Sequence, residues 1–367
     1  MSQFSIQRPD ELASGRLREL YRRHGYLPYR MSKFESYDLY VRNKRFLLSE
    51  NILTFTDTDG RLMALKPDVT LSIIKNTRDT VGALQKVYYN ENVYRAAPGS
   101  GYREIMQTGL ECIGQLDTLA IGEVLALAAQ SLAAITDSGT YILDLSHMGF
   151  VTGLLEGLEE DAAAELLTEI SKKNVPAIHE ICAKRGLPAD LAERAETLAR
   201  LYGPPEQVLP QLPPLSRGSH MDAALAELQA LCSLMEAMGL AENLRLDFSI
   251  VNDMNYYNGV IFRGYLPGLA SGVLAGGQYD KLLQRMGKTG GAIGFAVYLD
   301  QLERLETGEP EWDVDTLLLY GPEDDLAAVV QRAEALMAEG GSVRTERTVP
   351  PGLRCRRIIS MEKGESL

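Results

Sequence analysis

Apolar and polar residues follow two different periods along this chain, and the prevailing period changes along its length. In the first 147 residues, stretches with helical spacing stand among short stretches typical of strands. These patterns predict a helix over 9–24, an extended segment over 25–35, a hairpin over 52–66, a short helix over 71–75, strands over 84–95 and 102–114, a helix over 117–136 and a strand over 141–145. Helices and strands therefore both contribute to this part of the chain.

The middle of the chain has a different pattern. From residue 148 to residue 241 it is rich in alanine, leucine and glutamate at helical spacing, with prolines and glycines marking the breaks. We predict an all-helical insertion over 148–241, which leaves 1–147 and 242–306 as one core domain. Beyond a linker at 307–310, the pattern predicts a small C-terminal α/β unit over 312–367, with a strand, a helix and a second strand.

The stretch 244–302 combines alternating apolar residues with signals for tight turns. Its most informative runs are Val251-Asn-Asp-Met-Asn-Tyr-Tyr-Asn-Gly259, Gly276-Gly-Gln-Tyr-Asp280 and Gly290-Gly-Ala-Ile-Gly-Phe-Ala-Val297. Apolar alternation bounded by Asn-Gly and Gly-Gly predicts buried antiparallel strands. The Gly-rich run between Ala270 and Gly277 marks places where the backbone approaches another group closely.

Polar residues within the predicted strands suggest a ligand pocket. Residues two apart on a strand share a face, so Gln107, Gly109 and Glu111 point the same way and predict a polar floor with room for a ligand. The alternative is an exposed strand face. Asp68 and Thr70 follow Pro67 just before a predicted helix, so these two residues also suit an ordinary helix start.

Composition limits the class of protein. The 367 residues allow two domains, or one large domain with an insertion, and the 45% hydrophobic and 24% charged residues are ordinary for a folded protein. The net charge of −13 weighs mildly against a tRNA-binding protein, which usually needs a basic surface.

Neither metal binding nor export is indicated. The four cysteines and four histidines lie far apart and share no metal-ligand spacing. The start of the chain lacks the pattern of an export signal, and no apolar run reaches the roughly 20 residues that span a bilayer. We therefore expect a soluble, cytoplasmic protein with no metal, no cofactor and no membrane contact.

The order of these runs resembles histidyl-tRNA synthetase, a class II aminoacyl-tRNA synthetase. That family has a Leu-Val-Arg-Gly-Leu-Asp-Tyr-Tyr run, then Gly-Gly-Arg-Tyr-Asp, then Gly-Phe-Ala-x-Gly-Leu-Glu-Arg-Leu. Residues 25–35 are similar to its motif 1, although Ser32 replaces a proline of that motif. Residues 84–114 are similar to its motif 2, and Arg95 stands at the position of the ATP-binding arginine. The resemblance implies an α+β fold with a class II synthetase-like antiparallel sheet flanked by helices.

The resemblance also implies a site for histidine. The residues that match the family's histidine-binding set are Asp68, Thr70, Gln107, Glu111, Tyr256 and Tyr257. The first three would accept hydrogen bonds from the α-ammonium group, and Glu111 with a tyrosine would bind the imidazole.

Charged positions of the family's catalytic machinery are changed in this chain. Asn252 stands where the family has its catalytic arginine, Gln278 replaces the arginine of Gly-Gly-Arg-Tyr-Asp, and Gln301 replaces the motif 3 arginine that holds ATP. An amide cannot supply the fixed charge and rigid donor fork of a guanidinium group. Each lost charge-stabilising group costs about 10²–10³ in rate, so we expect no catalytic residues and no aminoacylation.

A synthetase core without this machinery resembles the regulatory subunits of ATP phosphoribosyltransferase. That resemblance implies a non-catalytic role in the first step of histidine biosynthesis, with a short-form catalytic subunit as partner. It also implies a homodimer through motif 1, histidine as an effector, and no tRNA. The alternatives are a diverged histidyl-tRNA synthetase and a stand-alone paralogue that binds or activates an amino acid.

Overall fold

A computed structural model describes residues 9–43, 52–77, 82–97, 101–136, 138–250, 256–304, 312–361 and 364–366. The chain divides into two compact units, of which the larger spans Ala13–Arg304 and the smaller contains the C-terminal strands. The helices of the larger unit are α1 (Pro9–Arg23), α2 (Tyr37–Arg42), α3 (Thr70–Asn76), α4 (Thr118–Ile135), α5 (Met148–Leu154), α6 (Glu160–Ser171), α7 (Val175–Lys184), α8 (Ala189–Arg200), α9 (Pro205–Val208), α10 (Gly218–Ala237) and α11 (Asp280–Arg285), with short 3-10 helices at Leu209–Gln211, Pro213–Leu215 and Leu299–Arg304.

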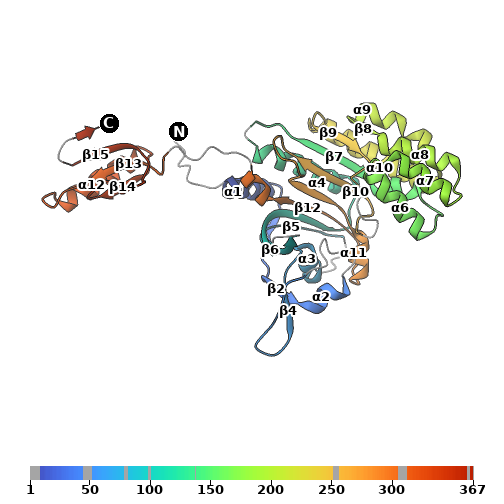
Figure 1. Cartoon of the computed structure of the whole chain (residues 1–367), viewed down its shortest axis with the longest axis horizontal. Helices are drawn as coiled ribbons and strands as arrows, with labels where there is room; N and C mark the ends of the chain where they lie inside the picture. Colours follow the sequence, from blue (N-terminus) through green and yellow to red (C-terminus); the bar gives the residue numbers. More distant parts are fainter. Residues whose placement is uncertain are drawn as a thin grey trace. The chain divides into compact units, whose positions relative to one another are not determined.

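A nine-stranded sheet forms the centre of the larger unit (Figure 1). In spatial order its strands are β1 (Leu27–Pro28), β5 (Leu84–Ala97), β6 (Gly101–Gly114), β12 (Gly291–Tyr298), β11 (Leu274–Gln278), β10 (Val260–Tyr265), β7 (Ile142–His147), β9 (Leu244–Asp247) and β8 (Tyr202–Gly203). The β1–β5 and β7–β9 pairs are parallel and the other pairs are antiparallel. A separate small sheet contains β2 (Phe34–Ser36), β4 (Leu62–Leu65) and β3 (Thr54–Thr56).

The structure confirms the predicted hairpins. Strands β3 and β4 flank a turn in which Asp57 Oδ1 accepts hydrogen bonds from the backbone N–H groups of Asp59, at 2.9 Å, and Arg61, at 2.8 Å. Such side-chain to backbone bonds are the reason that aspartate favours turns. Strands β5 and β6 pair along their whole length, from Leu84 opposite Gly114 to Ala97 opposite Gly101.

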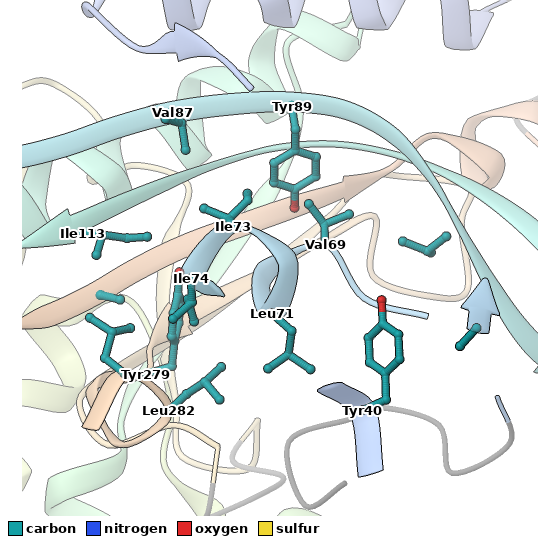
Figure 2. Packing of buried hydrophobic residues seen from close by; sticks show 14 residues of the cluster. Tyr40, Val69, Leu71, Ile73, Ile74, Val87, Tyr89, Ile113, Tyr279 and Leu282 are labelled. Atoms are coloured by element: carbon teal, nitrogen blue, oxygen red, sulfur yellow. The ribbon is translucent and has the colours of Figure 1, made fainter. Parts of the chain in front are cut away.

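Helix α3 forms a core beneath the strands β5 and β6. Its residues Leu71, Ile73 and Ile74 are fully buried and belong to one cluster with Val87 and Tyr89 of β5. Figure 2 shows Ile73, Val87 and Tyr89 between the helix and the strands, with the hydroxyl of Tyr89 pointing away from its own strand toward α3, while Leu71 extends from the opposite side of the helix. This packing fixes α3 under one face of the sheet and sets the position of the residues that precede the helix.

Helix α4 covers part of the sheet and packs against β10, β12 and α10. By length and composition alone it matches a membrane-spanning segment, but most of its residues are buried in this fold. Its apolar character is explained by this position between the sheet and α10, where nearly every face of the helix contacts protein.

Helices α6, α7 and α8 lie together near the strands β8 and β9 (Figure 1). The elements from Met148 to Ala237 are helices except for the two-residue strand β8, which the sequence pattern did not predict. The boundaries of the core and of the insertion stay a prediction.

The smaller unit has a four-stranded sheet in the order β14 (Val343–Glu346), β13 (Val314–Leu319), β15 (Cys355–Ser360) and β16 (Gly364–Ser366), with helix α12 (Leu326–Ala338). Three of these five elements were predicted, whereas β14 and β16 were not. Both are short and carry several charged or polar side chains, so they lack the apolar alternation that reveals a half-buried strand.

Candidate functional site

A cavity lies on the face of the large sheet that α3 also faces. All of the predicted pocket residues and the motif 2-like arginine line it. These residues are Asp68, Thr70, Arg95, Gln107, Glu111, Tyr256 and Tyr257. They come from four segments of the chain, so the fold brings together side chains that are nearly 190 positions apart in sequence.

Strand β6 supplies the polar floor that its alternation predicted. Gln107 and Glu111 are 3% and 2% exposed, so both side chains are buried in the cavity and the alternative of an exposed strand face is wrong. Gly109, between them, does not leave open room as expected. A Cβ there would lie 2.5 Å from the hydroxyl oxygen of Tyr89, so the glycine makes space for that tyrosine instead.

Glu111 is the buried acid at one end of the cavity. Its Oε1 accepts a hydrogen bond of 2.8 Å from Thr70 Oγ1, and its Oε2 accepts one from the hydroxyl of Tyr279. Burial raises the pKa of the Glu111 carboxyl to about 8, although these two hydrogen bonds act in the opposite direction. The nearby acid Asp68 raises this pKa further, so Glu111 readily accepts a proton or a cationic partner.

The segment before α3 supplies Asp68 and Thr70. Asp68 Oδ1 accepts a hydrogen bond of 3.0 Å from the N–H of Leu71 in the first turn of α3. Burial raises the pKa of Asp68, while this N–H group and the charge of Arg95 lower it. The helix-start interpretation and the pocket interpretation of Asp68 are therefore compatible, because the same carboxylate orders the helix and lines the cavity.

Two polar groups at the other end of the cavity have capacity for a ligand. Gln107 Nε2 is buried and has no hydrogen-bond partner among the residues that the structure describes. A buried donor without an acceptor costs about 1–3 kcal/mol, so a ligand oxygen or ring nitrogen would satisfy it. Arg95 Nε donates to the carbonyl oxygen of Pro67 at 2.9 Å, which fixes the guanidinium group at the cavity wall.

Tyrosines form much of the remaining wall. The rings of Tyr256 and Tyr257 meet edge to face with centroids 4.5 Å apart, and Tyr256 also contacts Tyr279. Sequence reasoning missed Tyr89, Tyr279 and Tyr298, which line the cavity too. Tyr279 stands in the Gly276–Asp280 run, whose sequence already indicated a site. Tyr89 and Tyr298 have no such neighbouring motif, and they line the cavity only because of the register of the sheet.

A network around Asp280 holds the tyrosine segment. Asp280 Oδ2 accepts hydrogen bonds from Asn258 Nδ2 at 2.9 Å and Gln278 Nε2 at 2.8 Å, and its backbone N–H donates to Asn258 Oδ1 at 2.7 Å. Its Oδ1 accepts from the N–H of Ala292 at 2.8 Å. Gln278, which replaces the family's arginine, therefore has a structural partner within the fold.

Gln301 is also bonded within the protein. Its Oε1 accepts a hydrogen bond of 2.9 Å from Ser271 Oγ, and its Nε2 donates to Asp300 Oδ2 at 2.9 Å. This amide carries no charge for a phosphate group. Asn252, the third changed position, lies outside the described residues. Within the described part of the chain, no cluster of histidine, cysteine, aspartate and glutamate is suited to hold a metal ion.

The raised pKa of Glu111 predicts a pH-dependent stability. Because the folded pKa of about 8 exceeds the ordinary value of 4.5, the stability that this group contributes is complete below about pH 4.5 and is lost as the pH rises through 8. The slope for one proton reaches about 1.4 kcal/mol per pH unit. Urea unfolding between pH 5.5 and 8.5 should show this decline in the wild-type chain and a flatter profile in Glu111→Gln.

The control for this experiment is Glu236→Gln, because Glu236 is exposed on α10. Its profile should follow that of the wild type. A Glu111→Gln profile as steep as the wild type would show that Glu111 does not hold its proton in the folded state.

Comparisons with known proteins identify the family. A family model described as histidyl-tRNA synthetase matches residues 7–302. The ATP phosphoribosyltransferase regulatory subunit of Caldanaerobacter subterraneus subsp. tengcongensis is 30% identical over 341 residues, which cover 89% of this chain and 87% of that protein.

Solved structures share the fold. A structure described as an ATP phosphoribosyltransferase regulatory subunit/histidyl-tRNA synthetase from Bacillus halodurans C has a TM-score of 0.82 at 24% identity and covers 98% of this chain and 99% of its own. A chain of the ATP phosphoribosyl transferase (HisG:HisZ) complex from Thermotoga maritima has a TM-score of 0.63 at 20% identity and covers 81% of this chain and 98% of its own. These likenesses confirm the predicted class II synthetase-like α+β fold.

Proposed function

The chain belongs to the family of ATP phosphoribosyltransferase regulatory subunits, within the wider histidyl-tRNA synthetase family, and from this membership we propose its role. It is the non-catalytic subunit that activates a short-form catalytic subunit in the first step of histidine biosynthesis, in the cytoplasm. The observation that supports this role best is the contrast within the site. The residues that match the histidine-binding set line one cavity, while Gln278 and Gln301 are neutral and bonded within the fold.

The ligand of the pocket is free L-histidine. Asp68, Thr70 and the oxygen of Gln107 accept hydrogen bonds from its α-ammonium group, and Glu111 binds the imidazole. The unpaired amide N–H₂ of Gln107 and the guanidinium of Arg95 suit the α-carboxylate. A site of this kind favours amino acids with an imidazole, because a ring N–H adds a hydrogen bond to Glu111 beyond those that it accepts from Thr70 and Tyr279.

Histidine in this pocket is the feedback signal. Inhibition is then a coupling free energy between the pocket and the active site of the catalytic subunit, and the catalytic subunit in turn changes the histidine affinity by the same factor. The chain itself forms no adenylate, because amide side chains stand at all three positions where the synthetase family has an arginine. Gln278 and Gln301 are bonded within the fold, and the third position is Asn252.

The chain forms a homodimer through the motif 1 region. Strand β1 is the edge of the nine-stranded sheet, and its residue Leu27 is 67% exposed. Leu84 beside it on β5 is also exposed, and both line a cavity of about 570 Å³. An open sheet edge flanked by apolar side chains is a surface that natural proteins usually cover, and a second copy of this chain would cover it.

Reconstitution tests this function. Phosphoribosyl-ATP synthesis by a purified short-form catalytic subunit should rise at least about tenfold when this chain is added, and histidine should reverse the gain. The mass of the complex, measured by light scattering, should contain this chain in even copy number. Histidine-dependent ATP–pyrophosphate exchange by the chain alone, without any effect on the catalytic subunit, would instead establish a synthetase.

A further inference from the structure

The floor of the pocket consists of small residues on neighbouring strands. In the sheet register Glu111 lies opposite Gly294, Gly109 opposite Ala296, and Gln107 opposite Tyr298. On the next strand, Gly277 lies opposite Gly294 and Ala275 opposite Ala296. Between the Glu111 end and the Gln107 end these positions are therefore glycine or alanine, and the hydroxyl of Tyr89 lies over Gly109 while the ring of Tyr257 lies over Gly277.

Tyr298 ends this series of small residues. It lines the cavity, is half-buried, and faces the same side of the sheet as Gly294 and Ala296 because the three are spaced two apart on β12. In the synthetase run that Gly294–Leu302 resembles, the corresponding position is a glycine.

The distance between Gln107 and Glu111 limits the length of a ligand that contacts both. Positions 107 and 111 are four residues apart on an extended strand, or about 13 Å at roughly 3.3 Å per residue, and both side chains reach into the space between. A ligand whose imidazole contacts Glu111 has its amino-acid backbone groups beside Gln107. Tyr298 is the cross-strand partner of Gln107 and also lines the cavity, so it borders the end that would receive the ligand carboxylate.

We infer that Tyr298 is a specificity-determining residue that restricts the pocket to an amino acid with a free α-carboxylate. Ligands extended at that carboxyl group, such as peptides, amides or nucleotide adducts, collide with its ring. This inference rests on the proposed function, since it takes the orientation of histidine from the roles of Glu111 and Gln107.

Calorimetric titration with L-histidine and with the dipeptide L-histidyl-glycine tests the inference, because the dipeptide keeps both charges but lengthens the carboxyl end. The wild-type chain should prefer histidine at least about 100-fold, within the range that a steric wall provides. In Tyr298→Ala this ratio should fall below about 10. Tyr298→Val, which keeps a strand-forming side chain, should behave like Tyr298→Ala.

Tyr298→Phe is the matched control, since it keeps the ring and loses only the hydroxyl group. Its ratio should equal that of the wild type. Histidine binding with the same ratio in Tyr298→Ala, Tyr298→Val and the wild type would overturn the role of Tyr298 and leave the histidine pocket standing. Absence of histidine binding by the wild-type chain would overturn the proposed ligand and this inference together.

Discussion

Gly294→Ala should abolish measurable histidine binding, weakening it more than about 100-fold, and should destabilise the chain by about 1–3 kcal/mol. A Cβ at this position would lie 2.6 Å from Cδ of Glu111 and 2.5 Å from the carbonyl oxygen of Leu110. The carbonyl belongs to the paired strand β6 and cannot move, so the Glu111 carboxyl must leave its place. Its hydrogen bonds from Thr70 and Tyr279 would break with it.

Calorimetric titration and urea unfolding of the variant measure the two effects. The control is Gly15→Ala on α1, where an added Cβ meets nothing within 4 Å. That control should bind histidine normally and gain up to about 1 kcal/mol from the better helix propensity of alanine. Normal histidine affinity in Gly294→Ala would mean that the ligand does not depend on the position of Glu111.

Glu111→Gln should weaken histidine binding by about 10- to 100-fold while leaving the fold intact. The amide has the shape of the acid and can still accept a hydrogen bond from Thr70 or Tyr279. It cannot become an anion, so the charge-assisted hydrogen bond to the imidazole, worth about 1.5–3 kcal/mol, is lost.

The same titration with Glu104→Gln provides the control. Glu104 is exposed on strand β6, where it bonds only to Asn92 and Tyr94 among the contacts that the structure describes. This variant should bind histidine as the wild type does. Equal affinities for Glu111→Gln and the wild type would remove Glu111 from the ligand site, whatever else the pocket binds.

The sequence allowed much of this site to be predicted, because its polar residues repeat a local pattern. Alternation on one strand placed Gln107 and Glu111 on the same face, and both line the cavity. Tyr89 and Tyr298 could not be predicted in this way. They reach the cavity only because β5 and β12 flank β6 in a particular register, and strand order is a long-range property that no local spacing contains.

The glycines illustrate a second limit. Close backbone approach near Gly277 was predicted, and a Cβ there would lie 2.6 Å from the ring of Tyr257. The role of Gly109 was misjudged as space for a ligand, because the sequence does not reveal that Tyr89 fills this space. The domain boundaries stay predictions, and Asn252 lies outside the described residues.

We propose that this chain carries a histidine site of its own. Calorimetric titration of the purified chain with L-histidine tests it most directly, with histidinol and L-alanine as comparison ligands. We expect one histidine to bind per chain, histidinol to bind more weakly because it lacks the carboxylate, and L-alanine not to bind. The absence of heat with histidine up to millimolar concentrations, or equal binding of all three ligands, would contradict it.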